Sequence, residues 1–121
     1  MKVVRTAEVA EESVNTPLFT GGTVTRQTIV PTEEANNFNC GIVSFGRGAR
    51  NKFHSHTSDQ VLIITSGIGI VATEKEVREV TVGDIIHVPA GEKHWHGARD
   101  QSPMAHITIT AKGSETTQLE E

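Results

Sequence analysis

Histidines and glutamine in two short stretches of this chain have the spacing of metal ligands. His54 and His56 are two residues apart, so on a strand both imidazoles project from the same face and can bind one cation. Gln60 follows a polar turn and begins the returning strand, and His94 comes after proline and glycine residues suited to a tight turn. The pattern predicts a site with three neutral nitrogen ligands and one amide oxygen.

The two stretches resemble the two signature motifs of the cupin family. The first has Gln60 where the family usually has Glu, and the second has Ala98 where the family often has Asn. The matching residues are Gly48, His54, His56, Gln60 and Gly67 in the first motif and Gly83, Pro89, Gly91 and His94 in the second. The resemblance covers the central half of the chain. It implies an all-β, single-domain, RmlC-like jelly-roll β-barrel that binds a metal, without specifying a reaction.

The glutamine in the first motif affects the chemistry of the metal. A carboxylate there would neutralise part of the charge of a divalent cation, whereas Gln60 leaves the protein ligands neutral and the ion a stronger Lewis acid. The ligand set accepts Mn, Fe, Ni, Cu or Zn. The alternative interpretation is that Gln60 is an ordinary strand residue beside a vestigial site.

A finer resemblance concerns the string GEKHWHGA at residues 91–98 and the later Met-Ala-His at residues 104–106. Together with the first motif, these strings are similar to small bacterial cupins that act as manganese-dependent hydroxynitrile lyases. The resemblance implies manganese at the four-residue site and two catalytic histidines, His96 and His106, that face the cavity. The metal would coordinate the hydroxyl of a cyanohydrin, one histidine would take its proton, and the other would stabilise or protonate the departing cyanide.

Two other functions fit the same residues. A cupin dioxygenase would hold Fe, Ni or Cu at the same four ligands and consume oxygen, and a non-enzymatic binding or sensing module would capture a small molecule without turnover. His96 also fits a role as a donor to a backbone carbonyl at the barrel rim, and His106 fits a hydrogen-bonded interior histidine.

Composition limits the class of protein. The 121 residues give room for one domain, and 11 glycines, 4 prolines and many β-branched residues favour short strands over helices. The formal charge is −4 and no basic cluster stands out, so we expect no nucleic-acid partner. The family resemblance implies a small-molecule substrate. We expect a cytoplasmic protein without membrane contact, because Cys40 is the single cysteine and the sequence shows neither an apolar leader nor an apolar run of membrane length.

The chain divides into a predicted N-terminal arm (1–22), a barrel (23–112) and a polar C-terminal tail (113–121) that we expect to be frayed. Strands are predicted at residues 23–30, 39–45, 60–65, 68–73, 76–82, 84–88 and 105–111. The run VLII after Gln60 is apolar on both faces of its strand. Since one face of a small barrel strand meets water, we expect a homodimer in which a second copy covers that face.

Overall fold

The computed structural model describes all residues, 1–121, and its elements are almost entirely strands. They are the 3-10 turn η1 (Thr6–Glu8) and the strands β1 (Glu12–Ser13), β2 (Phe19–Thr20), β3 (Val24–Val30), β4 (Phe38–Phe45), β5 (Arg50–Asn51), β6 (His54–His56), β7 (Gln60–Thr73), β8 (Val77–Thr81), β9 (Ile85–Val88), β10 (His94–Ala98), β11 (Met104–Ala111) and β12 (Thr116–Gln118). The structure contains no helix with the length and hydrophobicity of a membrane span. The predicted all-β, single-domain fold is confirmed.

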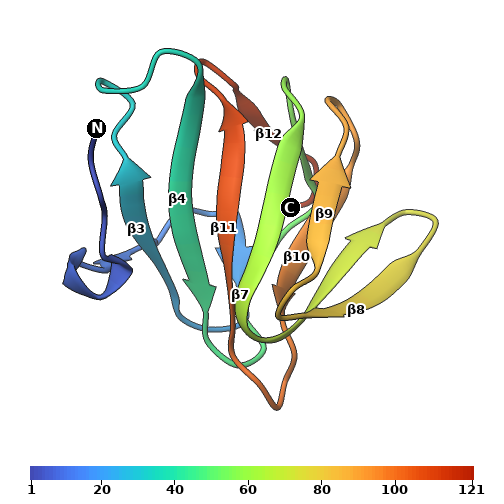
Figure 1. Ribbon diagram of the computed structural model, residues 1–121. Coiled ribbons are helices and arrows are strands. Elements are labelled where there is room, and N and C mark those ends of the chain that lie inside the picture. Colours follow the sequence, from blue (N-terminus) through green and yellow to red (C-terminus); the bar gives the residue numbers. More distant parts are fainter.

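Two antiparallel sheets face each other and share the long strand β7 (Figure 1). The first half of β7 pairs with β11 and β9 in a sheet that continues through β4 and β3 to β1. The second half pairs with β10 and β8 in the other sheet, where β10 also pairs with β5 and β6. The sheets curl around a common interior, and this interior holds the predicted site residues.

One continuous strand replaces the two that were predicted at 60–65 and 68–73. Gly67 has a φ of +73°, and a Cβ at this position would overlap the carbonyl oxygen of Pro103. Only glycine takes this conformation and this close approach together, so the chain bends from one sheet into the other without ending the strand. The bend gives both halves of β7 an inward face.

Alternation along β11 and β4 sorts the side chains into the interior and the outside. His106 lies opposite Val43, and Met104 lies opposite Phe45, in register on the inward face. Phe45 and Met104 are each 1% exposed and belong to the apolar core at one end of the barrel. His106 lies on the same inward face, two residues after Met104. The apolar core is therefore directly next to the polar cavity.

Both chain ends are part of the sheets. In the arm, β1 pairs with β3 and β2 pairs with β5. The tail was expected to be frayed, and this expectation is wrong: β12 pairs with β6, and the Leu119 amide donates to the Phe53 carbonyl at 2.8 Å. Polar composition suggested fraying, but the backbone hydrogen bonds of β12 do not depend on side-chain polarity. They cover the free edge of β6, the strand that carries His54 and His56.

Candidate metal centre

A cavity of about 530 Å³ lies between the two sheets. Five of the six predicted site residues line it: His54, His56, Gln60, His96 and His106. Val43 and Phe45 form an apolar part of its wall, while Thr108 and Thr110 add hydroxyls from β11. The sixth predicted residue, His94, is next to this group. The centroid of its ring is 4.3 Å from the centroid of the His54 ring.

Three of the predicted ligand residues, all histidines, lie close together. His54 and His56 extend from β6, and β10 places His94 directly opposite His54 in the antiparallel register. One ring nitrogen from each of the three lies within 4.8 Å of the others, and His54 and His94 are 1% and 3% exposed. The three side chains are therefore close enough to hold one ion.

Hydrogen bonds orient each of these imidazoles through Nδ1. The contacts are His54 to the Lys52 carbonyl at 2.6 Å, His94 to the Glu92 carbonyl at 2.8 Å and His56 to the Thr116 hydroxyl at 2.9 Å. A carbonyl oxygen only accepts, so Nδ1 of His54 and of His94 carries the hydrogen and Nε2 keeps its lone pair. Nε2 of His56 is buried without a partner. Histidines fixed in this way present Nε2 to a metal, and the residues fit a divalent cation.

Gln60 places its side-chain oxygen beside these histidines. Its Nε2 donates to Thr108 Oγ1 at 3.0 Å, and its Oε1 lies 3.1 Å from Nε2 of His94. In this arrangement Oε1 of Gln60 and Nε2 of His94 face each other, and both atoms are hydrogen-bond acceptors. A cation placed among them would satisfy both, so the position of Gln60 also fits a metal.

The electrostatic surroundings keep the candidate ligands neutral. Burial, with an added contribution from His94, lowers the pKa of His54 to about 3 and that of His56 to about 4. Burial also lowers the pKa of His94. All three imidazoles are therefore uncharged at pH 7, which is the form that binds metal ions.

His96 and His106 form a second, deeper pair. His96 lies two residues after His94 on the inward face of β10, and its Nδ1 is 3.0 Å from Nε2 of His106 on β11. The two side chains are 3% and 1% exposed. Burial lowers the pKa of His106 to about 4 and that of His96 well below its ordinary value, so both rings are neutral at pH 7.

Sequence reasoning missed Asn51, which contacts this pair. Asn51 is 3% exposed at the end of the two-residue strand β5. Its Oδ1 accepts from the backbone amide of His96 at 2.8 Å, and its Nδ2 lies 3.1 Å from Nε2 of the same residue. A lone asparagine in so short a strand gives no periodic signal, and only its three-residue distance from the first ligand could have drawn attention to it.

The sixth histidine lies outside the cavity. His87 is exposed on β9, and its Nε2 lies 2.8 Å from Oδ2 of Asp59. Trp95 points away from its neighbours His94 and His96, and its ring stacks under the Arg50 guanidinium at 4.2 Å.

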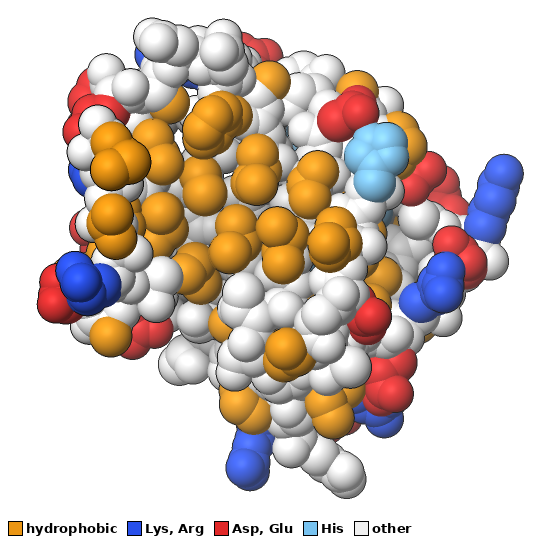
Figure 2. Space-filling view, viewed as in Figure 1, with side chains coloured by type: hydrophobic (Ala, Val, Ile, Leu, Met, Phe, Trp, Pro, Cys, Tyr) orange, Lys and Arg blue, Asp and Glu red, His pale blue; other side chains and the backbone are white.

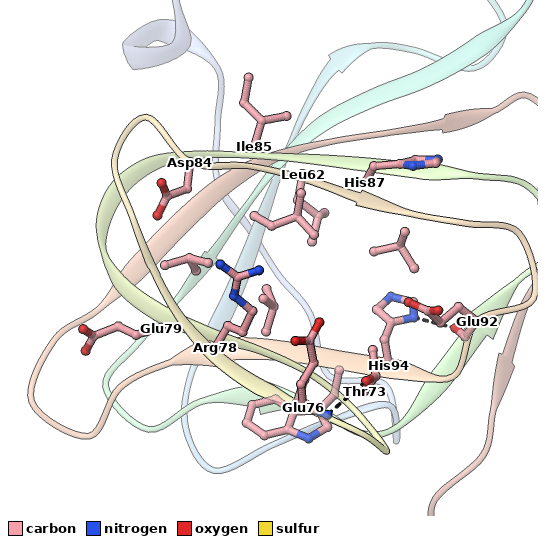
Figure 3. Close-up of a pocket in the computed structure, with 16 residues that line it drawn as sticks. Leu62, Thr73, Glu76, Arg78, Glu79, Asp84, Ile85, His87, Glu92 and His94 are labelled. Atoms are coloured by element: carbon pink, nitrogen blue, oxygen red, sulfur yellow. Dashed lines mark hydrogen bonds between the residues drawn. The ribbon is translucent and has the colours of Figure 1, made fainter.

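A second cleft of about 350 Å³ opens between β8 and β9, which pair with β7 and not with each other (Figure 3). Figure 3 shows Arg78, Glu76 and Asp84 around it, with Leu62 on its inner wall. Of the six predicted site residues, only His94 lines this cleft. Mixed charges over an aliphatic wall offer no convergent set of ligands, so the candidate site is the histidine cavity.

Comparison with known proteins places this geometry in a family. A family model described as a cupin domain matches residues 41–110. An (R)-mandelonitrile lyase of Granulicella tundricola is 43% identical over 68 residues, which are 55% of this chain and 52% of the lyase. An acireductone dioxygenase of Bacillus mycoides is 40% identical over 63 residues, 48% of this chain and 37% of the dioxygenase.

A solved structure of another protein has a similar fold. A cupin-like protein of Thermotoga maritima superposes with a TM-score of 0.84 at 30% identity, over 90% of this chain and 84% of that one. The chain matches about half the length of the lyase and less of the dioxygenase. The family model nevertheless spans more than half of the chain, and it includes all six predicted site residues. The chain belongs to the cupin family.

Proposed function

We propose that this cupin is a metal-dependent lyase that cleaves and forms cyanohydrins. The observation that carries the proposal is the placement of a neutral histidine pair directly beside the candidate metal ligands. The His96 ring stacks beside the His94 ring, with 5.6 Å between their centroids. The centroids of the His96 and His106 rings are 4.8 Å apart. The similarity to an (R)-mandelonitrile lyase over part of the chain supports the same reaction class.

The proposed metal site consists of His54, His56, Gln60 and His94. A divalent ion bound there, for which we propose manganese, would supply Lewis-acid polarisation of a substrate oxygen. The neutral imidazoles of His96 and His106 provide an acceptor for the hydroxyl proton. As that proton leaves, the C–CN bond breaks, its electron pair goes to cyanide, and the histidine pair returns a proton to give aldehyde and hydrogen cyanide.

The walls of the cavity suit a small organic substrate. Phe45 lies against both histidines of the pair, with ring centroids 5.9 Å from His96 and 5.5 Å from His106. Val43 extends this apolar surface. An aromatic or aliphatic substituent can pack here while the reacting carbon lies near the polar groups, so a small cyanohydrin such as mandelonitrile matches the site.

Two histidine variants test the catalytic role of the pair. The assay follows benzaldehyde release from mandelonitrile under argon by manganese-reconstituted protein. His96→Ala and His106→Ala should each lower kcat by about 100-fold or more while metal content is retained. His87→Ala is the matched control, since that histidine is exposed outside the cavity, and it should leave the rate unchanged. Full turnover in both cavity variants would contradict the assigned role.

A dioxygenase is the second candidate, because part of the chain is 40% identical to an acireductone dioxygenase. The same four ligands would serve it, and the histidine pair would have no required role as acid and base. Oxygen uptake with a small enol or diketone substrate, without cleavage of cyanohydrins, would favour this function over the lyase.

We further propose that the protein is a homodimer. The inward side chains of VLII, Leu62 and Ile64, are 0% and 2% exposed, while Val61 and Ile63 point outward. Figure 2 shows a continuous apolar surface over the central strands of this sheet. Its outward residues include Phe38, Cys40, Val61, Ile63, Ile85, Ile107 and Ile109. A second copy placed against this face would remove that surface from water.

A further inference from the structure

The side-chain amide of Asn51 has a fixed orientation. The backbone nitrogen of His96 can only donate, and it lies 2.8 Å from one end of the amide, which must therefore be the oxygen. The other end, the amide nitrogen, then lies 3.1 Å from Nε2 of His96 and 3.4 Å from its Nδ1. The backbone of β10 thus determines which amide atom meets the imidazole.

This orientation determines where the hydrogen of each buried imidazole lies. An amide nitrogen only donates, and Nε2 is the nearer of the two ring nitrogens of His96, so we assign Nε2 as its acceptor and place the single hydrogen of the neutral ring on Nδ1. That Nδ1 is 3.0 Å from Nε2 of His106, which therefore accepts in turn. The hydrogen of His106 is consequently on its own Nδ1, an atom buried without a partner.

We infer that Asn51 is a positioning residue that sets the direction of a proton relay from His96 to His106. Its catalytic meaning rests on the lyase function proposed above, whereas the positions of the hydrogens do not. A substrate hydroxyl that replaces the Asn51 N–H at Nε2 of His96 gives its proton to that atom. The Nδ1 hydrogen of His96 then passes to Nε2 of His106. Both transfers reverse when cyanide takes its proton, and the pair returns to its starting form.

Long-range ¹H–¹⁵N spectra of chelator-treated protein labelled with ¹⁵N-histidine test the inference directly. In the wild type, His96 and His106 should each be protonated on Nδ1. Asn51→Asp should move both hydrogens to Nε2, because a carboxylate only accepts. Asn51→Ala should remove the preference for Nδ1. The matched control is Asn39→Ala, which removes another amide from the cavity wall that contacts neither histidine and should leave both signals unchanged.

Turnover measurements separate this inference from the proposed function. In metal-loaded protein, the Asn51 variants should lower kcat for mandelonitrile by about 10- to 100-fold with little change in KM or metal content. Expected hydrogen positions without any cyanohydrin cleavage would overturn the lyase and leave the positioning role standing. A wild-type His96 protonated on Nε2, or an Asn51→Ala variant with unchanged spectra and kcat, would overturn the inference.

Discussion

At the scale of residues, the candidate metal ligands depend on partners that hold them in place. Thr108 is such a partner, because its hydroxyl accepts from the amide of Gln60 and leaves the amide oxygen facing the histidines. Thr108→Val should lower metal affinity by about 10- to 100-fold, since the amide is then free to rotate. A titration of chelator-treated protein with manganese measures this.

Thr110→Val is the matched control for that substitution. Thr110 extends from the same face of β11 into the same cavity, and its hydroxyl contacts Asn39 and not Gln60. The control should bind metal as the wild type does. Equal affinities for wild type, Thr108→Val and Thr110→Val would show that Thr108 does not position Gln60.

Sequence reasoning placed the candidate ligands well and their supporting residues poorly. His54 and His56 were predicted together because a strand carries i and i+2 on one face, and His94 was predicted from the second motif. Asn51 and Thr116 contact the histidines through register between distant strands, and no local pattern shows such register. The roles of His96 and His106 stay predictions.

At the scale of elements, two glycines show what the strand connections require. Gly67 and Gly83 both have positive φ, of +73° and +95°. A Cβ at Gly83 meets nothing within 4 Å, whereas one at Gly67 would overlap the backbone of Pro103. Gly83→Ala should therefore cost only the backbone strain, about 1–2 kcal/mol, and Gly67→Ala considerably more. Urea unfolding of both variants measures the difference, and equal costs would argue against the tight bend in β7.

The C-terminal strand β12 supports the metal site from outside. It pairs with β6, and the Thr116 hydroxyl holds Nδ1 of His56. Removal of residues 113–121 should leave the barrel folded by circular dichroism but lower its affinity for manganese, because His56 loses its partner and β6 its neighbour. Thr116→Val should reproduce part of the loss without truncation. Unchanged affinity in both proteins would contradict a role of the tail at the site.

The positions of the strands were largely predictable from the sequence, whereas the continuity of β7 and the pairing of β12 were not. Alternating apolar residues and turn signals predicted the positions of β3, β4, β7, β8, β9 and β11 to within two residues. The continuity of β7 depends on a contact between Gly67 and Pro103, which are far apart in sequence. The pairing of β12 depends on the free edge of β6. Both are tertiary effects that a single sequence does not display.

At the scale of the whole molecule, the buried histidines make stability depend on pH. The folded pKa values, about 3 for His54 and about 4 for His56 and His106, lie below the ordinary value of 6.5. Between pH 6.5 and 4 the unfolded chain thus binds more protons than the folded one, and stability falls as pH falls. Urea unfolding of metal-free protein at pH 7, 5.5 and 4.5 should show this decline.

One substitution provides the control for the pH dependence. His106→Gln removes one titrating group, so its stability should decline less steeply over the same range. A wild type with constant stability between pH 7 and 4.5 would contradict the burial of neutral histidines.

The proposed dimer is a property of the outer apolar face. Ile109→Arg would place a charge in the middle of that face and should shift the sedimentation coefficient from dimer to monomer at micromolar concentration. Val77→Arg is the control, because Val77 is 68% exposed on β8, in the other sheet. A monomeric wild type, or a dimer that Ile109→Arg leaves intact, would contradict the proposal.

The central claim is that a metal held by the histidine cavity supports cyanohydrin cleavage. Its most direct test titrates chelator-treated protein with manganese under argon while benzaldehyde release from mandelonitrile and bound metal are followed together. We predict that turnover rises with bound metal to a plateau at one ion per chain, and that His54→Ala shows neither binding nor turnover. Binding of one ion per chain without turnover, or turnover independent of bound metal, would contradict the account.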